Sequence, residues 1–525
     1  MLNAWAIWWN SQSLAGLLAP YWDAPIFWPT KSTFALSEPM LASILVAPMV
    51  KWSSLPAAYN TYLVASLMLN AWFARRFLIV AGSPKLLSTL SGCAMILHPL
   101  AWENLEAIQL AALWPSIWFW QSLCSATKPT DPWRTTLTMG LAIIASVLTC
   151  IHQALLLSVL IPLPIFVACY FAESRLTFLR TCAAAVMIAG ICIGPMLLTM
   201  NGLQDAMNLQ RDTAQVSLLS AQLSDWSPLP KTAWHQEPSH SARKSLAPGV
   251  LLSLMATAGL ALAMIPRRGE RRQHSRTPMM VMSTVILSGI VLSLGPHLTI
   301  AGEKPWFWLC DLLPPLARVR SPYRFAFFVQ TAMVLQSFLV LGLLARVLYA
   351  NSNSLHGTWA RSCLQSLPIV AALLLTAEIV PERSQLVFPP TSANPPQWTQ
   401  FLSSEVSGFA QDNAVLCLPL AANISEDAQQ TETRWMLYAC QHGHPIINGY
   451  SGFTPRQSAR LFAQIQDACD GNTTIELPPI EGVAAIVVDK RHSNINSVQD
   501  YQKAFSDDRF DLYVQLREVM SDKEN

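Results

Sequence analysis

The residues with the clearest chemical potential are acidic side chains that stand beside long apolar stretches. Asp23 lies in YWDAPIFWP and Glu38 in SEP, while HPLAWENLE brings His98, Glu103 and Glu106 within nine residues. An ionisable group next to lipid is costly to keep unless it is used. A carboxylate can act as a base toward a hydroxyl group or can hold a divalent cation such as Mg²⁺ or Mn²⁺. We therefore take Asp23, Glu38, Glu103 and Glu106 as candidate catalytic residues.

A second group of candidates is basic. The segment LARVRSPYRF supplies Arg318, Arg320 and Arg324, and His152 stands in a sharp turn between two apolar stretches. Guanidinium groups bind phosphate oxygens in a bidentate manner and can stabilise a phosphate leaving group. Together with His98, these residues are candidates for substrate binding. Acids and arginines at one membrane face suit group transfer from a lipid phosphate, although the spacing identifies no ligands for a metal.

A simpler interpretation remains open for every one of these groups. A carboxylate or histidine at a helix end can be a solvated residue that the helix dipole favours, and an arginine beside an apolar helix can simply reach lipid phosphates. The chain contains no GxGxxG, P-loop, HExxH or GxSxG motif, so soluble nucleotide chemistry has no support. No feature favours nucleic-acid binding either.

The elements that must position these residues are apolar. Charged residues make up 13% of the 525, against roughly 25% in soluble domains, which excludes an ordinary cytosolic enzyme. The composition predicts a mainly α fold, a polytopic transmembrane helix bundle in contact with the lipid bilayer. Ten stretches are long enough to span about 30 Å of hydrocarbon: 57–76, 84–100, 107–126, 136–151, 154–172, 179–200, 248–266, 278–296, 324–346 and 366–382.

Basic residues between these stretches predict the orientation of the bundle. If all ten stretches cross, the basic residues of the short loops fall on one side, which the positive-inside rule makes cytoplasmic. Residues 1–56, the loops 201–247 and 297–323, and the chain after 382 then lie outside. The basic residues that set this orientation are Arg75, Arg76, Lys128, Arg134, Arg175, Arg180, Arg267, Arg268, Arg271, Arg272, Arg276, Arg346 and Arg361.

Charge also divides the chain. Residues 383–525 hold 10 Lys and Arg against 17 Asp and Glu, a net charge of −7, whereas residues 1–382 hold 24 against 15, a net charge of +9. We therefore predict three regions: 1–56 as outer interfacial helices and a loop, 57–382 as the transmembrane bundle, and 383–525 as a small extracytoplasmic α/β domain.

The first of these regions is predicted to lie on the membrane surface. Trp5, Trp8 and Trp9 share one face of a helix, and 40–51 is apolar but too short to span comfortably.

In the last region, 414–420, 484–488 and 510–517 are typical of strands, and 426–441, 455–469 and 497–507 of helices. Cys310, Cys417, Cys440 and Cys469 would all lie outside, where one or two disulfides can form, with the pairing left open.

Five sequence segments, in three parts of the chain, resemble a known family. YWDAPIFWPTKSTFALSEPMLASILVAP resembles the first outer loop of bacterial GT-C-type polytopic glycosyltransferases and the related YfhO-like proteins. LPPLARVRSPYRFAFF is similar to their segment R-x-P-x-R-F, which enters a late membrane helix. VLCLPL, HPIINGYSGFTP and EGVAAIVVD are similar to their outer α/β tail. The resemblance covers most of the chain in arrangement, with short and degenerate motifs.

The resemblance implies transfer of a sugar from a polyprenyl-phosphate donor to an envelope glycan or lipid acceptor on the outer face of a bacterial inner membrane, helped in some members by a divalent cation. Asp23 and Glu38 match the later acids of the first outer loop. Arg320 and Arg324 match the R-x-P-x-R-F arginines, and Glu103 and Glu106 match a second-loop acid only loosely.

One departure leaves two interpretations open. The usual catalytic Asp of the family precedes the first tryptophan, where this chain has only Leu2, Asn3 and Ala4 before Trp5. Either the start lies further upstream, or the protein lacks the base and is a non-catalytic membrane scaffold or accessory protein. A third class, a solute transporter, requires mid-membrane charges, and Glu378 near the end of the last stretch is the closest to that description.

Overall fold

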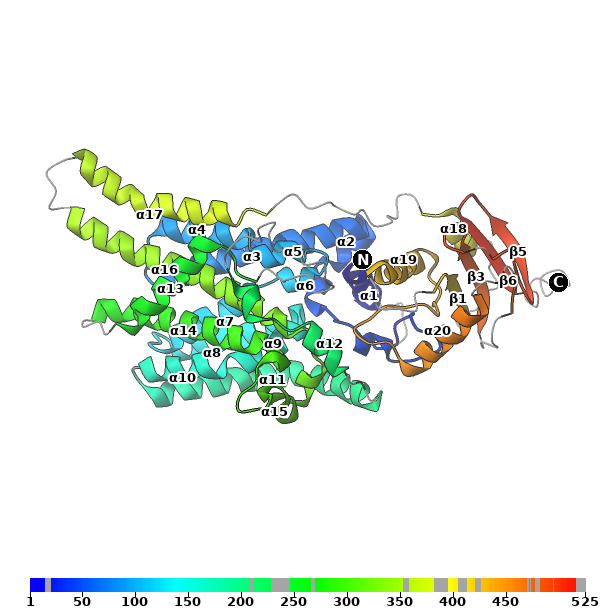
Figure 1. The fold of residues 1–525 in the computed structure, drawn as a ribbon, viewed down its shortest axis with the longest axis horizontal. Helices are drawn as coiled ribbons and strands as arrows, with labels where there is room; N and C mark the ends of the chain where they lie inside the picture. Colours follow the sequence, from blue (N-terminus) through cyan, green and yellow to red (C-terminus); the bar gives the residue numbers. More distant parts are fainter. Residues whose placement is uncertain are drawn as a thin grey trace. The chain divides into compact units, whose positions relative to one another are not determined.

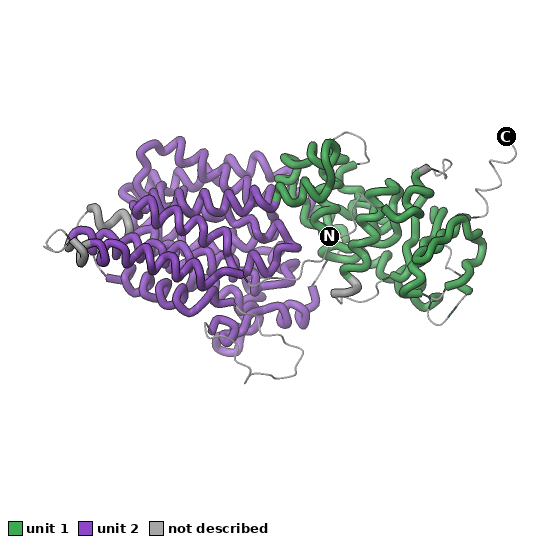
Figure 2. The backbone as a smooth tube through the Cα atoms, turned by 90° about the horizontal axis from the view of Figure 1, so that it is seen from above, with its two compact units in different colours: residues 1–62, 202–208, 385–525 green, residues 63–201, 209–384 purple. Residues whose placement is uncertain are grey.

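The computed structural model describes residues 1–14, 20–207, 209, 211–227, 246–265, 270–352, 358–381, 395–404, 413–420, 426–469, 472, 474–476, 482–493 and 495–515. These residues form two compact units, shown in different colours in Figure 2. Unit 1 combines residues 1–62, 202–208 and 385–525, and unit 2 combines residues 63–201 and 209–384. The two ends of the sequence thus share one unit, whereas the sequence predicts separate regions for them.

Unit 2 is built from helices (Figure 1). Its elements in chain order are α3 (Leu55–Val80, which begins in unit 1), α4 (Lys85–Ile96), α5 (Pro99–Glu103), α6 (Ile108–Ala111), α7 (Trp114–Ala126), α8 (Pro132–Thr149), α9 (Ile151–Leu160), α10 (Pro162–Phe171), α11 (Arg175–Ala206, which ends in unit 1), α12 (Thr213–Leu218), η3 (Leu223–Trp226), α13 (Val250–Met264), α14 (Glu270–Ser293), η5 (Gly295–His297), α15 (Pro305–Leu312), η6 (Pro314–Arg318), η7 (Pro322–Phe325), α16 (Ala326–Ser352) and α17 (Thr358–Glu378).

Four stretches of described helix are long and apolar enough to cross a membrane, and they indicate a multi-pass membrane protein. They are Leu55–Val80, Arg175–Ala206, Arg276–Ser293 and Pro322–Ala350. Helices α9 and α10 give a fifth if they count as one span, since they meet at a 52° bend. These stretches coincide with five of the ten predicted spans. The other five contain helices that are shorter, such as α4 with 12 residues and α7 with 13, or less apolar.

Two predicted spans are shorter because the chain between Ile96 and Trp114 breaks into short helices. Pro99 begins α5, and α6 ends before Ala112. The backbone groups left free by these breaks bind buried polar side chains. Asn70 donates to the carbonyl oxygen of Ala111 at 2.8 Å and accepts from the Leu113 N–H at 2.9 Å. Irregular backbone inside an apolar bundle is stable when neighbouring side chains satisfy its polar groups in this way.

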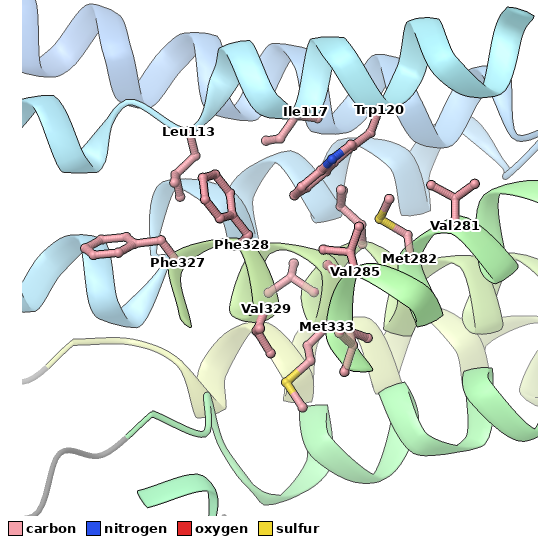
Figure 3. Packing of buried hydrophobic residues seen from close by; sticks show 14 of the residues in the cluster. Leu113, Ile117, Trp120, Val281, Met282, Val285, Phe327, Phe328, Val329 and Met333 are labelled. Carbon is pink, nitrogen blue, oxygen red and sulfur yellow. The ribbon is translucent and has the colours of Figure 1, made fainter. Parts of the chain in front are cut away.

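Burial distinguishes the central helix of unit 2 from a peripheral one. In the span that contains α16, 89% of an apolar stretch of 18 residues is buried inside the protein, whereas the corresponding share in α11 is 22%. Helix α16 is therefore surrounded by protein, while α11 exposes an apolar surface suited to lipid. Figure 3 shows Phe328 and Met333 of α16 packed among side chains of α7 and α14. Trp120 of α7 meets the Phe328 ring edge-on, with ring centroids 6.2 Å apart.

Polar side chains on α16 join it to neighbouring helices. The Gln336 amide donates to the carbonyl oxygen of Ala256 at 2.8 Å and accepts from the Ser283 hydroxyl at 3.2 Å. A Cβ atom at Gly259 would overlap the Gln336 side chain, so the glycine permits this close approach. Polar groups buried in an apolar bundle are stable only when they are paired in this way.

Glu378 caps a helix of the same bundle. Its two carboxylate oxygens accept from the N–H groups of Leu251 and Leu252, at 2.8 and 3.0 Å, and so satisfy the first turn of α13 from the end of α17. A Cβ atom at Gly249 would overlap this carboxyl group. Glu378, the charge considered above for a transporter, therefore has a structural role at the start of α13.

Replacing Glu378 by alanine is expected to lower the free energy of unfolding by about 2–3 kcal/mol, because two charge-assisted hydrogen bonds are lost at a helix start. Thermal unfolding of the purified protein in detergent measures the change. Glu173→Ala is the matched control: it removes an exposed carboxylate that pairs with Lys128 at 2.6 Å, and such surface pairs contribute about 0–1 kcal/mol. Equal losses for the two variants would contradict the capping role.

Unit 1 contains a small mixed sheet with strand order β1-β3-β6-β5. β1 is parallel to β3, and β6 is antiparallel to both β3 and β5. Strands β1 and β3 are buried along their whole length, as expected for parallel strands of a sheet that is covered on both faces. The elements are η1 (Thr33–Leu36), η2 (Leu41–Val46), α1 (Leu2–Leu14), α2 (Ala47–Trp52), α18 (Gln397–Ser404), β1 (Ala414–Leu418), α19 (Glu426–His442), α20 (Arg456–Cys469), β2 (Thr474–Ile475), β3 (Val483–Asp489), β4 (Ser497–Val498), β5 (Tyr501–Ser506) and β6 (Phe510–Gln515).

Most of the elements predicted for the C-terminal region are confirmed, but one is wrong. β1, β3 and β6 match the predicted strands, and α19 and α20 match two predicted helices. The predicted helix 497–507 is instead strands β4 and β5. Residues 501–506 pair antiparallel with the next strand, β6, and this hairpin pairing outweighs the local helix propensity of Gln502, Lys503 and Ala504. No disulfide joins the cysteines of the described chain.

The N-terminal aromatic residues belong to the core of unit 1. Trp5 and Trp9 are 0% and 1% exposed, and their rings stack with centroids 6.5 Å apart. They pack with Phe34 in a cluster that also contains β1 and β3. The prediction of a helix is confirmed, but this tryptophan face packs within unit 1 rather than lying open on a membrane surface.

The loop around Asp23 is joined to the C-terminal sheet. The N–H of Phe27 donates to the carbonyl oxygen of Asn448 at 3.0 Å, and that of Trp28 donates to Ile446 at 3.1 Å. Ile447 in turn donates to Val415 of β1 at 3.0 Å. The segments APIFWP and HPIINGYSG, far apart in the sequence, thus lie side by side.

Candidate functional site: a cluster of arginines and a histidine in unit 2

The candidate site lies in unit 2, where η6, η7 and the start of α9 are close together. Pro322 sets the start of η7, which leads directly into α16. His152 is in the first turn of α9, a helix whose Cys150 sulfur accepts from the Gln153 N–H at 3.4 Å. The Gln153 amide donates to the carbonyl oxygen of Leu110 at 2.7 Å, which fixes this turn against the broken segment. The position of His152 is therefore set by a capped and anchored helix start.

Three arginines lie within electrostatic reach of the His152 side chain: Arg324, Arg320 and Arg211. No described residue forms an ion pair with Arg320 or Arg324. The Nε of Arg324 is buried and has no hydrogen-bond partner among the described residues. Like charges brought together repel unless an anion lies among them. The arrangement is suited to a ligand with a phosphate or carboxylate group.

Arg318 contributes to the frame of this cluster. Its guanidinium donates to Asn201 Oδ1 at 2.7 Å, and its carbonyl oxygen accepts from the Arg211 Nε at 3.3 Å. Arg318 therefore joins η6 to Asn201 and to Arg211. Sequence reasoning missed Arg211, which stands in the long loop 201–247. The only signal available was its basic side chain in a loop assigned to the side opposite the short basic loops.

His98, predicted to bind substrate, is a capping residue. It is 0% exposed, its Nδ1 accepts from the Ala101 N–H at 3.2 Å, and its Nε2 lies 3.2 Å from the Thr331 hydroxyl. Because the Thr331 hydroxyl donates to the carbonyl oxygen of Phe327 at 2.7 Å, it accepts from His98, whose proton is then on Nε2. Both ring nitrogens are thus used to start α5 and to join it to α16.

Glu103 and Glu106 are exposed, and the structure does not place them on one helix. Helix α5 ends at Glu103, and the turn that follows separates it from Glu106. Glu103 therefore ends a helix, and Glu106 lies in the turn that follows it.

Asp23 and Glu38 belong to unit 1, whereas the other candidates belong to unit 2. The Asp23 carboxylate accepts from the Ser32 N–H at 2.7 Å and holds a left-handed residue in place. Burial, with a contribution from the charge of Glu38, raises the pKa of Tyr21, whose hydroxyl donates to Asn10 at 3.0 Å. Asp23 thus fixes the conformation of its own loop.

The acids do not form a recognisable cation site. Among the described residues, no three His, Cys, Asp or Glu side chains are grouped so that they could hold a metal ion. His442 and His444 stack with ring centroids 5.8 Å apart. Burial and the neighbouring His444 lower the pKa of His442 to about 3, and its Nδ1 accepts from the His444 N–H. His442 is therefore a neutral core residue, and we derive no chemistry through a divalent cation.

Comparison with known proteins adds no family to this description. A scan against protein-family models gives no match for the chain, and a search of curated proteins finds no similar sequence.

Proposed function

We propose that the chain is a polytopic membrane protein of the GT-C type, which binds a polyprenyl-phosphate-linked sugar and supports its transfer to an envelope glycan or lipid. The observation that carries this proposal is the position of Arg320, Arg324 and Arg211 within electrostatic reach of His152, together with the buried Nε of Arg324, which has no hydrogen-bond partner among the described residues. A phosphate attached to a membrane lipid fits such a site because its charge meets the arginines while its tail stays in the bilayer. The resemblance of LPPLARVRSPYRFAFF to the R-x-P-x-R-F segment agrees with this assignment.

In this proposal the chain makes all ten predicted crossings. The shorter helices α4, α7 and α13 then span with the help of adjoining segments, and the basic loops face the cytoplasm. Residues 1–56 and 383–525 are then outside a bacterial inner membrane. A donor made in the cytoplasm and moved across the membrane would be used at this face.

The arginines have two roles in the proposed reaction. They hold the donor phosphate before reaction, and they stabilise the charge that grows on it as the bond from phosphate oxygen to sugar breaks. An acceptor hydroxyl would attack the sugar carbon from the opposite side and lose its proton to a base. The described contacts of Asp23 and Glu38 assign this proton to neither of them.

A second candidate function, a non-catalytic scaffold, is favoured by one observation. Asp23 uses its carboxylate to hold Ser32, and its loop pairs with the segment 446–448 in unit 1. An acid that maintains a fold is not free to act as a base. The same architecture without a base would bind lipid-linked sugars without transferring them.

Incubating the purified protein in nanodiscs with a radiolabelled polyprenyl-phosphate sugar and candidate acceptors tests the proposal. Release of polyprenyl phosphate in step with labelled acceptor is the expected result for the enzyme. Donor binding without turnover over a panel of sugars and acceptors would favour the scaffold. Absence of both binding and turnover would contradict both functions.

A further inference from the structure

The short helix α15 has two apolar faces, and only one of them is packed. Trp306 is 4% exposed and belongs to the core of unit 2, with Leu309 packed against that core. On the other side, Trp308 is 55% exposed and Leu312 is 75% exposed, and Phe307 is exposed between the two faces. Asp311, the one charged residue of α15, is also exposed and falls between Phe307 and Trp308 on the helix surface. A helix in an aqueous loop would carry mostly polar side chains on its outer face, whereas three of the four exposed side chains of α15 are apolar.

The apolar surface extends beyond the helix. Ile300 is exposed on the tight turn that pairs it with Glu303, just before α15. Lys304 is exposed at the junction. Ile300, Phe307, Trp308 and Leu312 are called the α15 face below.

The position of α15 in the chain indicates what covers this face. The candidate span Arg276–Ser293 ends shortly before it, and the candidate span Pro322–Ala350 begins shortly after it. A segment that joins the ends of two spans lies at a bilayer surface. Tryptophan and lysine at the edge of an apolar surface are typical of the boundary between headgroups and acyl chains.

We propose that α15 lies in the membrane interface, with the α15 face inserted among the lipids and Trp306 anchored in the protein. Helix α15 is in contact with η6, which ends at Arg318. The inserted face therefore keeps the arginine cluster at the depth of the lipid phosphates. The proposal does not depend on catalysis, so it can fail or hold independently of the proposed function.

Depth-dependent quenching tests this inference in the full-length protein. An environment-sensitive fluorescent amino acid is incorporated at Trp308, and in a second variant at Leu312. Each protein is reconstituted in nanodiscs of phosphatidylethanolamine and phosphatidylglycerol. Spin labels on the lipid headgroup or deep in the acyl chain report contact with lipid, and aqueous iodide reports contact with water.

Two positions calibrate the measurement. Ile191 is 71% exposed on α11, a candidate span, and is expected to be quenched by the acyl-chain label. Gln464 is exposed on α20 of unit 1 and is expected to respond to iodide alone. Unchanged elution and thermal unfolding establish that each variant is folded, and the two α15 positions provide independent tests.

Probes at Trp308 and Leu312 are expected to lose most of their fluorescence with the headgroup label, to lose less with the acyl-chain label, and to resist iodide. Iodide quenching equal to that at Gln464, with no quenching by lipid labels, would overturn the inference. Protection from lipid labels and iodide alike would also overturn it, because the face would then be covered by protein.

Discussion

Replacing Arg320 and Arg324 together by alanine is expected to reduce kcat/KM for sugar transfer by about 10²–10³-fold, the usual effect of removing donors that stabilise transition-state charge. Each single variant is expected to lose less, because the remaining arginines, with Arg211, still attract the phosphate. The loss should appear in both KM and kcat, since the same groups bind the ground-state phosphate and the leaving group.

Matched variants separate charge from geometry. Arg320→Lys with Arg324→Lys keeps the positive charge but not the bidentate geometry, so it should restore only part of the activity. Arg180→Ala removes an exposed arginine of α11 outside the cluster and should leave transfer unchanged. A folded double alanine variant with wild-type transfer would contradict the phosphate-binding role.

The second large effect concerns stability and involves Asn448 in unit 1. Its side chain accepts from the Cys417 N–H at 2.7 Å and donates to the Cys417 carbonyl oxygen at 2.9 Å, so it continues the pairing of β1. It also lies 3.2 Å from the buried carboxylate of Glu432, which accepts from the Gly449 N–H. A Cβ atom at Gly449 would lie 3.0 Å from the Phe27 ring, so this part of the core has little room to adjust.

Asn448→Ala is expected to cost about 3–5 kcal/mol, because it leaves the buried N–H and carbonyl groups of Cys417 without this partner and removes one donor from the buried Glu432 carboxylate. For a unit of this size, such a loss lowers the melting temperature by roughly 10 °C. Thermal unfolding of the full-length protein, followed by protease sensitivity of unit 1, measures the effect. Gln464→Ala, at an exposed position of α20, should change the melting temperature little. Equal melting temperatures for the two variants would contradict this account of unit 1.

The sequence predicted those helices whose conformation is decided by their own residues. The long apolar runs of α3, α11 and α16 are helices because hydrophobicity and helix propensity agree there. The stretch from Ile96 to Trp114 escaped prediction because its breaks are stabilised by Asn70, Gln153 and Gln330, which are distant in sequence. Strand β5 escaped prediction for a different reason, since its pairing with the next strand, β6, decides its conformation against the local helix propensity.

The candidate site was predicted in part. Arg320, Arg324 and His152 were chosen singly for their chemistry, and the structure brings them together with Arg211. His98 was chosen by the same reasoning, but Thr331 and the N–H of Ala101 give it a structural role. Asp23 and Glu38 lie in unit 1, where residues 27 and 28 pair through their backbone with the C-terminal segment. This pairing was not predicted because it has no signature in either stretch alone.

The most direct test of the central claim is equilibrium binding of polyprenyl phosphate to the purified protein in nanodiscs, compared with polyprenol of the same length. The account predicts saturable binding of the phosphate by the wild-type protein, a loss of about 10²-fold in affinity in the double alanine variant, and no measurable binding of polyprenol. Equal affinity of the wild-type protein and the double variant for polyprenyl phosphate would contradict it.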